Sequence, residues 1–405
     1  MNKKIILVLS LIIIMNNNKP FVKYLSKKNF IINNSKNYYI INYFYNNETY
    51  KLINSNLNRN EYMTKGLQFL NEIKKNHLNN ISNQINFLNK HPKISLIIPI
   101  YNCEQTIELS LNSILLQTLK EIEIILVNDL SSDNSSQIIK KYQSIDRRII
   151  ILNNKRNMGT LYSRCIGALN SRGEYIFGLD NDDLLLDKDV LETVYLNSKI
   201  NNFDIVEIKP FNIPNYNPKN HTIWDGEFIN HPNNLILHQP ELGTFSIAQN
   251  KILDLSDHFI WGKCIKTRIY KLAVNKLGKK RYSYFNCWTE DISMVFIIFN
   301  IAKSFIFLNM FGIFHITNPT TASKKINNSH KFITHIFFLD ILYDFSKNDF
   351  VTKKYVAEYA LTFSKDLINE LDIKSKLYFN SIIKKIIECK YISNEYKHKI
   401  IYKFK

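Results

Sequence analysis

A buried strand that runs directly into three carboxylates constrains this chain more than any other feature. Tyr175 to Leu179 is apolar and of strand length, and Asp180, Asp182 and Asp183 follow it within four positions. An unpaired carboxylate resists leaving water for a protein core. The three acids must therefore lie at the end of the strand, where they cap a helix, face solvent or surround a cation. Two helix caps would not need three acids, so the pattern favours a divalent cation.

The chain before this strand alternates between apolar runs and helical patterns. The apolar runs of strand length lie at 94–99, 122–127, 148–152 and 175–179. Strands that are apolar throughout and alternate with helices indicate a parallel sheet covered on both sides. Asp129 follows the second strand, as the three aspartates follow the fourth. The polar residues therefore gather at carboxyl ends of strands, where open α/β sheets bind ligands.

The formal net charge of +18 is compatible with nucleic-acid or membrane-surface binding. Lysine, asparagine and isoleucine are over-used along the whole sequence, however, and it contains no arginine-rich helix or basic patch interleaved with aromatic residues. The charge thus reflects a compositional bias, and we expect no nucleic-acid partner. The spacing of the five cysteines does not match that of metal ligands. A Cys264–Cys287 bridge is conceivable in an oxidising compartment.

The first residues have the composition of a secretory signal. Two lysines precede the apolar run Ile5 to Met15, which would be about 16 Å long as a helix against a hydrocarbon thickness of about 30 Å. We therefore expect a signal peptide or a short anchor in residues 1–15, with membrane association through the N-terminus as an option. This predicts the secretory pathway (lumenal, in the endoplasmic reticulum or Golgi) or secretion. A cytoplasmic protein is the alternative.

Residues 16–92 form an extension rich in asparagine and lysine. Within it, residues 38–45 and 50–53 predict the two strands of a hairpin. Residues 65–88 carry leucine and isoleucine at helical spacing. We expect this segment to be an amphipathic helix that docks on the neighbouring domain or forms a stem.

The C-terminal part of the chain predicts further helices. The apolar run 292–316 is interrupted by asparagine and lysine, which favours a helix followed by a core strand over a membrane span. Residues 326–405 predict a helical region. Within it, 355–373 and 377–389 read as amphipathic helices that pack on the domain.

Several motifs follow one another between Lys93 and about Ser323. They are Ile97-Ile98-Pro99-Ile100-Tyr101-Asn102, Ser113-Ile114-Leu115-Leu116-Gln117-Thr118, Val127-Asn128-Asp129-Leu130-Ser131-Ser132-Asp133, Asn157-Met158-Gly159 with Arg164, Gly173-Glu174-Tyr175-Ile176 with Asp180-Asn181-Asp182-Asp183, Trp261-Gly262-Lys263 and Thr289-Glu290-Asp291. Together they resemble the catalytic domain of glycosyltransferase family 2. The chain departs from the family's pattern at Asn128, Leu130 and Cys165, where an acid, a glycine and an asparagine are usual.

This resemblance implies a glycosyltransferase-A-like fold over residues 93–325. That fold is α/β, with a mixed, mainly parallel sheet flanked by helices. The catalytic domain would consist of a nucleotide half, 93–200, and an acceptor half, 201–325. The helical and hairpin extension before it and the helical region after it lie outside the resemblance.

Roles for individual residues are also implied by the resemblance. Asp182 would be the direct ligand of a divalent metal, Mn²⁺ or Mg²⁺, and Asp180 would face the metal or the ribose. Asp291 would be the catalytic base, with Glu290 binding the acceptor or capping the helix. The implied nucleotide-binding residues are Pro99, Tyr101, Asp129, Arg164 and Asp180, and the implied acceptor-side residues are Trp261 and Lys263.

Several of these residues also have ordinary structural interpretations. Asp129 could be a turn residue before a capped helix, and Tyr101 an ordinary aromatic side chain at a strand end. Thr289-Glu290-Asp291 fits an N-cap followed by acids in the first turn, where the helix dipole favours them. His315 could be a further metal ligand, but a lone histidine at a strand end is more often structural, and we interpret it so.

The predicted function is metal-dependent, inverting transfer of a sugar from a nucleoside diphosphate sugar, in particular a UDP-sugar, to a hydroxyl of a glycan, lipid or protein acceptor. One alternative is a non-catalytic nucleotide-sugar-binding domain of the same fold. The other is nucleotidyl transfer, which normally needs a glycine-rich phosphate loop after the first strand. Residues 99–104 contain no glycine, which argues against that alternative.

Overall fold

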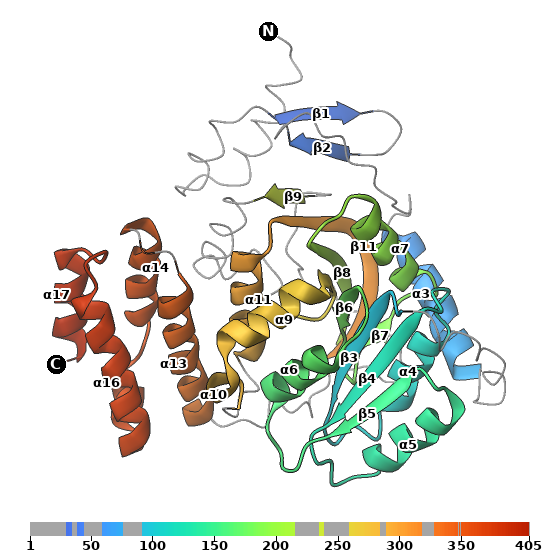
Figure 1. Cartoon of the computed structure of the whole chain (residues 1–405), viewed down its shortest axis with the longest axis horizontal. Coiled ribbons are helices and arrows are strands. Elements are labelled where there is room, and N and C mark those ends of the chain that lie inside the picture. The colour runs from blue at the N-terminus through green and yellow to red at the C-terminus, as the bar shows by residue number, and fades with distance from the viewer. Residues whose placement is uncertain are drawn as a thin grey trace.

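The computed structural model shows a sheet domain at one side of the molecule and a row of helices at the other (Figure 1). It describes residues 30–34, 39–43, 59–75, 91–214, 235–238, 259–283, 289–317, 328–346, 348 and 350–404. The predicted signal or anchor in residues 1–15 lies outside the described residues. Within the described part of the chain, no helix combines the length and the apolar character needed to cross a membrane.

A nine-stranded sheet forms the centre of the fold. In spatial order its strands are β5 (Ile149–Asn153), β4 (Ile122–Asn128), β3 (Ile94–Ile100), β6 (Tyr175–Gly178), β10 (Lys263–Lys266), β8 (Ile205–Pro214), β11 (Ser304–Thr317) and β7 (Leu184–Leu185), and β9 (Leu235–His238) pairs with β11. The pairs β5–β4, β4–β3, β3–β6 and β8–β11 are parallel. β10, β7 and β9 run antiparallel to their partners. The predicted mixed, mainly parallel sheet is thus confirmed.

The four strands predicted before the aspartate cluster are all present, and each end lies within one residue of its predicted position. They pair in parallel because a helix follows each of the first three and returns the chain to the same end of the sheet before the next strand. The division into a nucleotide half and an acceptor half remains a prediction. The conceivable Cys264–Cys287 bridge is not formed, since Cys264 is a free thiol buried in β10; Cys287 lies outside the described residues.

Helices cover both faces of the sheet. One face carries α3 (Arg59–Lys75), α4 (Ile107–Leu115), α5 (Ser135–Ile145) and α7 (Val190–Ile200). The other face carries α6 (Thr160–Asn170), α9 (Thr267–Leu277), α10 (Lys279–Tyr282) and α11 (Glu290–Ile301). Alternation along β3 serves both cores: Leu96 and Ile98 pack with α4, whereas Ile97 packs with α6.

The N-terminal extension docks on the domain through α3, as predicted for the first part of residues 65–88. Tyr62, Phe69, Leu70 and Ile73 on this helix are buried. The predicted hairpin of residues 38–45 and 50–53 is not tested. β2 (Tyr39–Tyr43) overlaps the first predicted strand, but its partner is the preceding segment β1 (Phe30–Asn34). Residues 50–53, the second predicted strand, lie outside the described residues.

Five helices of the described residues follow β11, as a helical C-terminal region was predicted. They are α13 (Asn328–Phe345), α14 (Phe350–Ala360), α15 (Lys365–Asn369), α16 (Ile373–Glu388) and α17 (Asn394–Phe404). The single helix predicted over 355–373 is wrong, because the chain turns after Ala360 and Ser364 is extended before α15. The helix-then-strand interpretation of 292–316 is confirmed by α11 and β11.

Candidate active site

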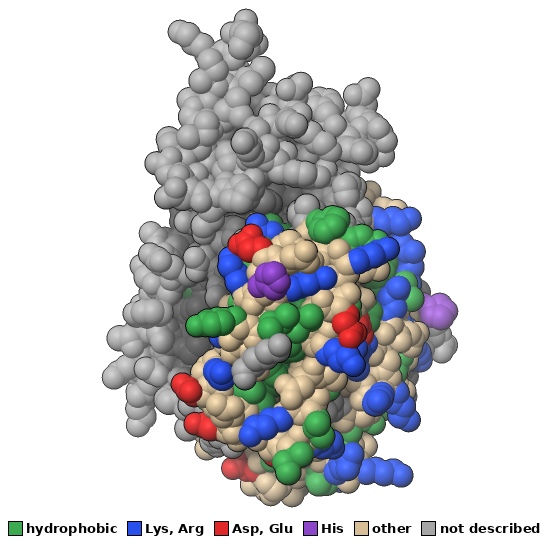
Figure 2. Space-filling model, turned by 90° about the vertical axis from the view of Figure 1, so that its left-hand side faces the viewer, with side chains coloured by type: hydrophobic (Ala, Val, Ile, Leu, Met, Phe, Trp, Pro, Cys, Tyr) green, Lys and Arg blue, Asp and Glu red, His purple; other side chains and the backbone are tan. Residues whose placement is uncertain are grey.

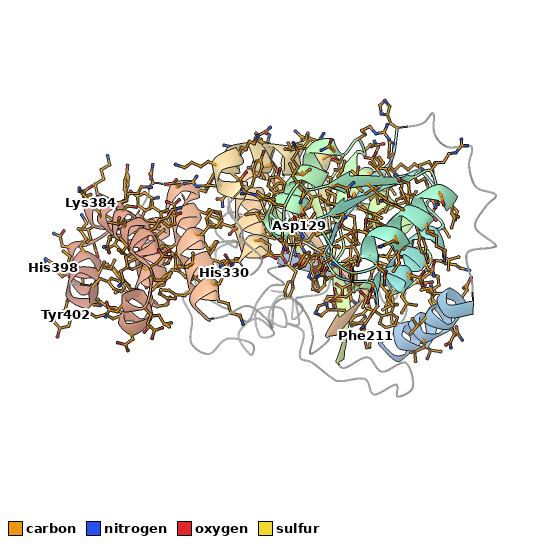
Figure 3. The ribbon with its side chains drawn as sticks, turned by 90° about the horizontal axis from the view of Figure 1, so that it is seen from below. Asp129, Phe211, His330, Lys384, His398 and Tyr402 are labelled. Atoms are coloured by element: carbon orange, nitrogen blue, oxygen red, sulfur yellow. The ribbon has the colours of Figure 1, made fainter. Side chains whose placement is uncertain are left out.

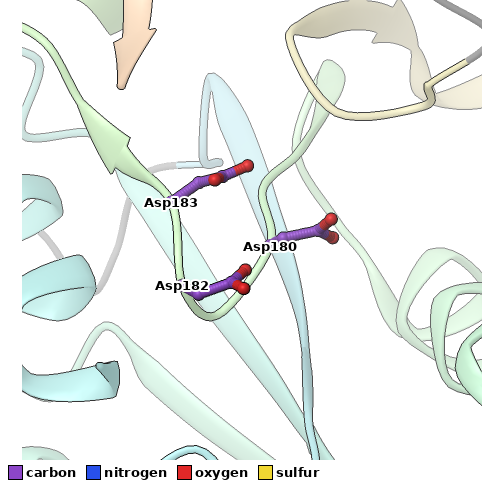
Figure 4. A group of neighbouring side chains, drawn as sticks. All are labelled: Asp180, Asp182 and Asp183. Carbon is purple, nitrogen blue, oxygen red and sulfur yellow. The ribbon is translucent and has the colours of Figure 1, made fainter. Parts of the chain in front are cut away.

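Three aspartates project from the turn between β6 and β7 (Figure 4). One ligand atom from each of Asp180, Asp182 and Asp183 lies within 4.8 Å of the others. The turn is tied to the first strand, because Asn181 Nδ2 donates to the Pro99 carbonyl oxygen at 2.8 Å. Pro99 therefore supports the turn through its backbone.

The electrostatics of this cluster suit a bound cation. Burial and the neighbouring charges of Asp183 and Asp180 raise the pKa of Asp182 to about 8, although His315 opposes that shift. Close carboxylates that repel one another in this way are stabilised by a divalent cation, and their oxygens are the donors that Mg²⁺ and Mn²⁺ prefer. The residues present thus fit the predicted metal.

Arg164 on α6 connects this cluster to the start of α11. Its side chain is buried, its Nη2 lies 2.5 Å from Asp180 Oδ1, and its Nη1 forms an ion pair with Asp291. The predicted nucleotide contact of Arg164 remains a prediction. What the structure shows is a guanidinium that joins two carboxylates from distant parts of the chain.

Glu290 and Asp291 occupy different environments although they are adjacent in the first turn of α11. Asp291 pairs with Arg164. Glu290 is buried, and its Oε2 has no hydrogen-bond partner among the described residues. Burial raises the pKa of Glu290, against the opposing effect of Arg164. Both acids lie in the first turn of α11, as the capping interpretation predicts, and Asp291 is also linked to the aspartate cluster through Arg164.

Asp129, at the end of β4, holds the beginning of α6. Its Oδ1 accepts from the Met158 backbone N–H at 2.8 Å and from Asn154 Nδ2 at 2.7 Å, and its Oδ2 accepts from the Gly159 N–H at 2.8 Å. Gly159 has φ +86°, a conformation that favours glycine. Asp129 thus has a structural role. Its nucleotide contact remains a prediction.

Three aromatic rings stack beside the aspartate cluster. Trp261 stacks on Phe259, at 4.7 Å between ring centroids, and on His315, at 4.9 Å, and the Phe259 and His315 centroids are 6.3 Å apart. His315 Nδ1 is 2.9 Å from Asp183 Oδ1. Burial disfavours the charged imidazole, but the carboxylates of Asp183, Asp180 and Asp182 outweigh it and raise the pKa of His315 to about 9. The histidine therefore orients Asp183.

Comparison with known proteins identifies the domain that carries this arrangement. Residues 95–265 match the family model described as glycosyl transferase family 2. Residues 95–265 form a glycosyltransferase family 2 domain. The resemblance stated from the motifs is confirmed.

Named relatives agree with this family. Glycosyltransferase GlyA of Streptococcus pneumoniae serotype 4 is 31% identical over 198 residues, which cover 47% of this chain and 27% of GlyA. Poly(ribitol-phosphate) beta-N-acetylglucosaminyltransferase TarP of Staphylococcus aureus is 36% identical over 118 residues, covering 28% of this chain and 35% of TarP. The chain thus spans about a third or less of the length of these relatives.

Solved structures agree with the fold. S. aureus TarS 1–349 in complex with UDP-GlcNAc superposes with a TM-score of 0.56 at 16% identity, over 77% of this chain and 88% of that one. This confirms the glycosyltransferase-A fold.

Two predicted residues of the family 2 domain contact the protein in ways the sequence did not indicate. Lys263 is only 1% exposed, and its Nζ pairs with Glu207 at 2.9 Å and donates to the Phe259 carbonyl at 2.7 Å. Lys263 therefore holds the backbone of Phe259, one of the three stacked rings. Its buried ammonium group could contribute to an acceptor site only indirectly. Trp261 is buried in the stack, and Phe259, which the sequence analysis missed, presents the exposed ring.

Tyr101 and Leu130 lie where the family 2 domain was predicted to contact nucleotide. Tyr101 is 42% exposed and Leu130 is 56% exposed. Leu130, which replaces the usual glycine of the family, has φ +61°. The departure noted in the sequence therefore falls at a position whose backbone conformation favours glycine.

Proposed function

We propose that this chain transfers a sugar from a nucleoside diphosphate sugar to an acceptor hydroxyl with inversion at the anomeric carbon. One observation carries the proposal: Arg164 joins the aspartate cluster to the acids that begin α11. The family 2 domain and the curated glycosyltransferases support the reaction class. The UDP-GlcNAc complex of TarS supports a UDP-sugar donor.

Asp182 and Asp180 would hold the divalent cation, Mn²⁺ or Mg²⁺. When bound, such a cation neutralises negative charge on the diphosphate leaving group. Asp183 would orient the turn through its contact with His315. Tyr101, exposed at the end of β3, could stack on the base. Asp129 still has acceptor capacity for a base imide, because a carboxylate has about four lone-pair sites and three donors occupy it.

Asp291 is the base in this proposal. Its ion pair with Arg164 holds the carboxylate beside the aspartate cluster, to which Arg164 is also paired. It takes the hydroxyl proton as the acceptor oxygen bonds to the anomeric carbon, and the diphosphate leaves with the electrons of the broken bond. Glu290, whose raised pKa favours the neutral acid, would instead hydrogen-bond the acceptor.

The test uses the full chain with UDP-GlcNAc, UDP-glucose and UDP-galactose, measuring UDP release with and without Mn²⁺. Asp182→Asn is nearly isosteric at a turn, so it should fold normally yet lose metal-dependent donor binding in calorimetry. Asp366→Asn, on the remote helix α15, is the matched control and should bind as wild type. Unchanged donor affinity in Asp182→Asn removes this residue from the metal site. Binding without turnover would support the non-catalytic alternative.

The compartment proposed here is the cytoplasmic alternative. The relatives named above come from bacteria, which lack an endoplasmic reticulum and Golgi. Fractionation of cells that express the full chain tests this. Recovery of the protein only in a secreted or membrane fraction would restore the secretory prediction.

A further inference from the structure

Two loops at the carboxyl edge of the sheet are fastened to each other. The first follows β3 and the second follows β4, and Asp129 N donates to the Ile100 carbonyl at 2.8 Å, which continues the pairing of the strands. Five further backbone N–H groups donate to side-chain oxygens across the loops: Asn102 N to Ser131 Oγ (3.2 Å), Ser132 N to Asn102 Oδ1 (2.8 Å), Cys103 N to Ser135 Oγ (2.8 Å), Glu104 N to Asp133 Oδ2 (3.0 Å) and Asn134 N to Glu104 Oε2 (2.9 Å). These loops therefore form one pre-organised unit.

Each loop holds one residue in the left-handed region. Asn102 has φ +48° and Leu130 has φ +61°. Asparagine tolerates this conformation, and the Asn102 side chain uses it to accept from Ser132. Leucine does not tolerate it, because its Cβ approaches the following carbonyl oxygen. Leu130 thus destabilises the loop in which it lies.

The Leu130 side chain is not buried in a core, so no packing offsets the cost of this backbone conformation. Leu130 is 56% exposed and belongs to neither hydrophobic core. Tyr101, the other large exposed side chain of the two loops, directly follows Ile100, as Leu130 directly follows Asp129, and a hydrogen bond joins Asp129 to Ile100. A strained residue that exposes an apolar side chain, in a loop fastened to one that exposes an aromatic ring, indicates a binding role.

We propose that Leu130 is a specificity-determining contact for the base of the nucleotide, which would lie against Leu130 and Tyr101. This inference rests on the proposed function, since it assumes a nucleoside diphosphate donor. The flat face of a base is apolar and packs well on aliphatic and aromatic side chains. The ligand class is a pyrimidine nucleoside diphosphate, for which UDP serves as the probe.

Replacing Leu130 should change the melting temperature and the affinity for UDP in opposite directions. Leu130→Gly removes the strain, so the melting temperature should rise by about 2 °C. The same variant should bind UDP with Mn²⁺ about fivefold more weakly, the factor expected for losing about 1 kcal/mol of apolar contact. Leu130→Asn should also raise the melting temperature and weaken UDP binding, as Leu130→Gly does. Leu377→Asn, an exposed leucine on the remote helix α16, should leave UDP affinity unchanged.

Inorganic pyrophosphate with Mn²⁺ separates base contact from general loop damage, because it has no base. Its affinity should be the same in wild type and Leu130→Gly. Equal UDP affinity in a stabilised Leu130→Gly variant overturns the inference, as does an equal loss of UDP and pyrophosphate binding. If wild type binds no nucleoside diphosphate at all, the proposed function fails first and this inference fails with it.

Discussion

Arg164 balances the charge of the candidate active site, because its guanidinium forms ion pairs with Asp180 and Asp291. A buried guanidinium with two carboxylate partners is held firmly, since losing either partner leaves an uncompensated charge. Asp291 and Glu290 differ in their contact with it. Asp291 forms the ion pair, whereas the charge of Arg164 lowers the pKa of the buried Glu290 without outweighing the effect of burial.

The first residue-scale prediction concerns turnover. Asp291→Asn should lower kcat by a factor of about 10² or more, because a positioned base contributes about 10² to 10⁴. Donor binding should remain nearly intact in this variant. Glu290→Gln is the matched control, and it should act mainly on the acceptor KM. Near-normal kcat in Asp291→Asn together with loss of activity in Glu290→Gln would reverse the assignment.

The second residue-scale prediction concerns how the melting temperature depends on pH. Because the pKa of Glu290 is raised in the folded state, its folded form binds a proton more tightly than the unfolded chain does. Its contribution is present at pH below the unfolded pKa and is lost as pH rises through the folded pKa. Glu290→Gln removes that loss, so its melting temperature should exceed wild type at pH 8 and approach it at pH 4. A difference that does not change with pH would contradict the shift.

Adjacent residues were the easiest part of the site to predict. Asp180, Asp182 and Asp183 follow one strand, so their grouping could be read directly from the sequence. Arg164 could not be matched to Asp291, because α6 and α11 are brought together only by the folded sheet. His315 was interpreted as an isolated structural residue for the same reason. Its contact with Asp183 depends on the antiparallel register of β11 on β7, which pairs Phe314 with Leu184.

At the scale of the elements, α3 packs against segments that adjoin the candidate site. Gly66 packs so closely that an added Cβ would lie 2.5 Å from the ring of Phe314, the neighbour of His315. Lys65 forms an ion pair with Asp187, a few residues after the aspartate cluster. Tyr62 packs edge-on against Phe311 at 5.5 Å between ring centroids. The helix thus contacts β11 and the segment that follows β7.

Gly66→Ala tests this support. In an open helix the change would stabilise by about 1 kcal/mol, but overpacking a buried site typically costs about 1 to 3 kcal/mol. We expect a lower melting temperature and weaker Mn²⁺ binding by calorimetry. Asn380→Ala, exposed on α16, is the control that should show only the gain in helix propensity. A Gly66→Ala variant as stable as that control would contradict the close contact.

The elements themselves show where sequence patterns suffice. Strands of the nucleotide half were predicted because they are apolar throughout and each ends in polar residues. The pairing of β1 with β2 was missed, since the segment between them lacks the distinctive turn residues that fix pairing from sequence. The turn between α14 and α15 contains neither glycine nor proline, so nothing in the pattern marked it.

For the whole molecule, the C-terminal helices share a core with the sheet domain. Phe296 of α11 packs with Phe338 of α13 at 6.2 Å between ring centroids. Asp340 on α13 accepts from Arg281 on α10 (3.0 Å) and from Lys385 on α16 (3.2 Å). Asp129 lies in the sheet domain, while Lys384, His398 and Tyr402 lie at the outer end of the helices (Figure 3).

Deletion of residues 328–405 should therefore leave an unstable domain, because it exposes the apolar face of α11. The expected result is aggregation, or a melting temperature well below that of the full chain. Asp340→Asn gives a graded version, in which loss of charge weakens the contacts with Arg281 and Lys385. A soluble deletion variant with wild-type stability would show that the two parts fold independently.

The outer surface of these helices bears on the charge of the chain. Figure 2 shows lysines scattered among apolar and polar side chains on this side, with acidic side chains between them. Several are paired one helical turn apart, such as Lys399 with Glu395 and Lys384 with Glu388. This mixed surface agrees with the expectation that the charge of +18 reflects composition.

The order of strands in the sheet has a consequence during synthesis. β3 to β6 are translated in succession and can pair at once, but the free edge of β6 must wait for β10. At about 5 to 20 residues per second, that wait is on the order of ten seconds. An unpaired edge can recruit other chains, so the ribosome-bound intermediate is the form of this protein most exposed to misassembly. The same edge later receives β10, and the bridge between Gly178 and Trp261 just before that strand brings Trp261 to the end of β6.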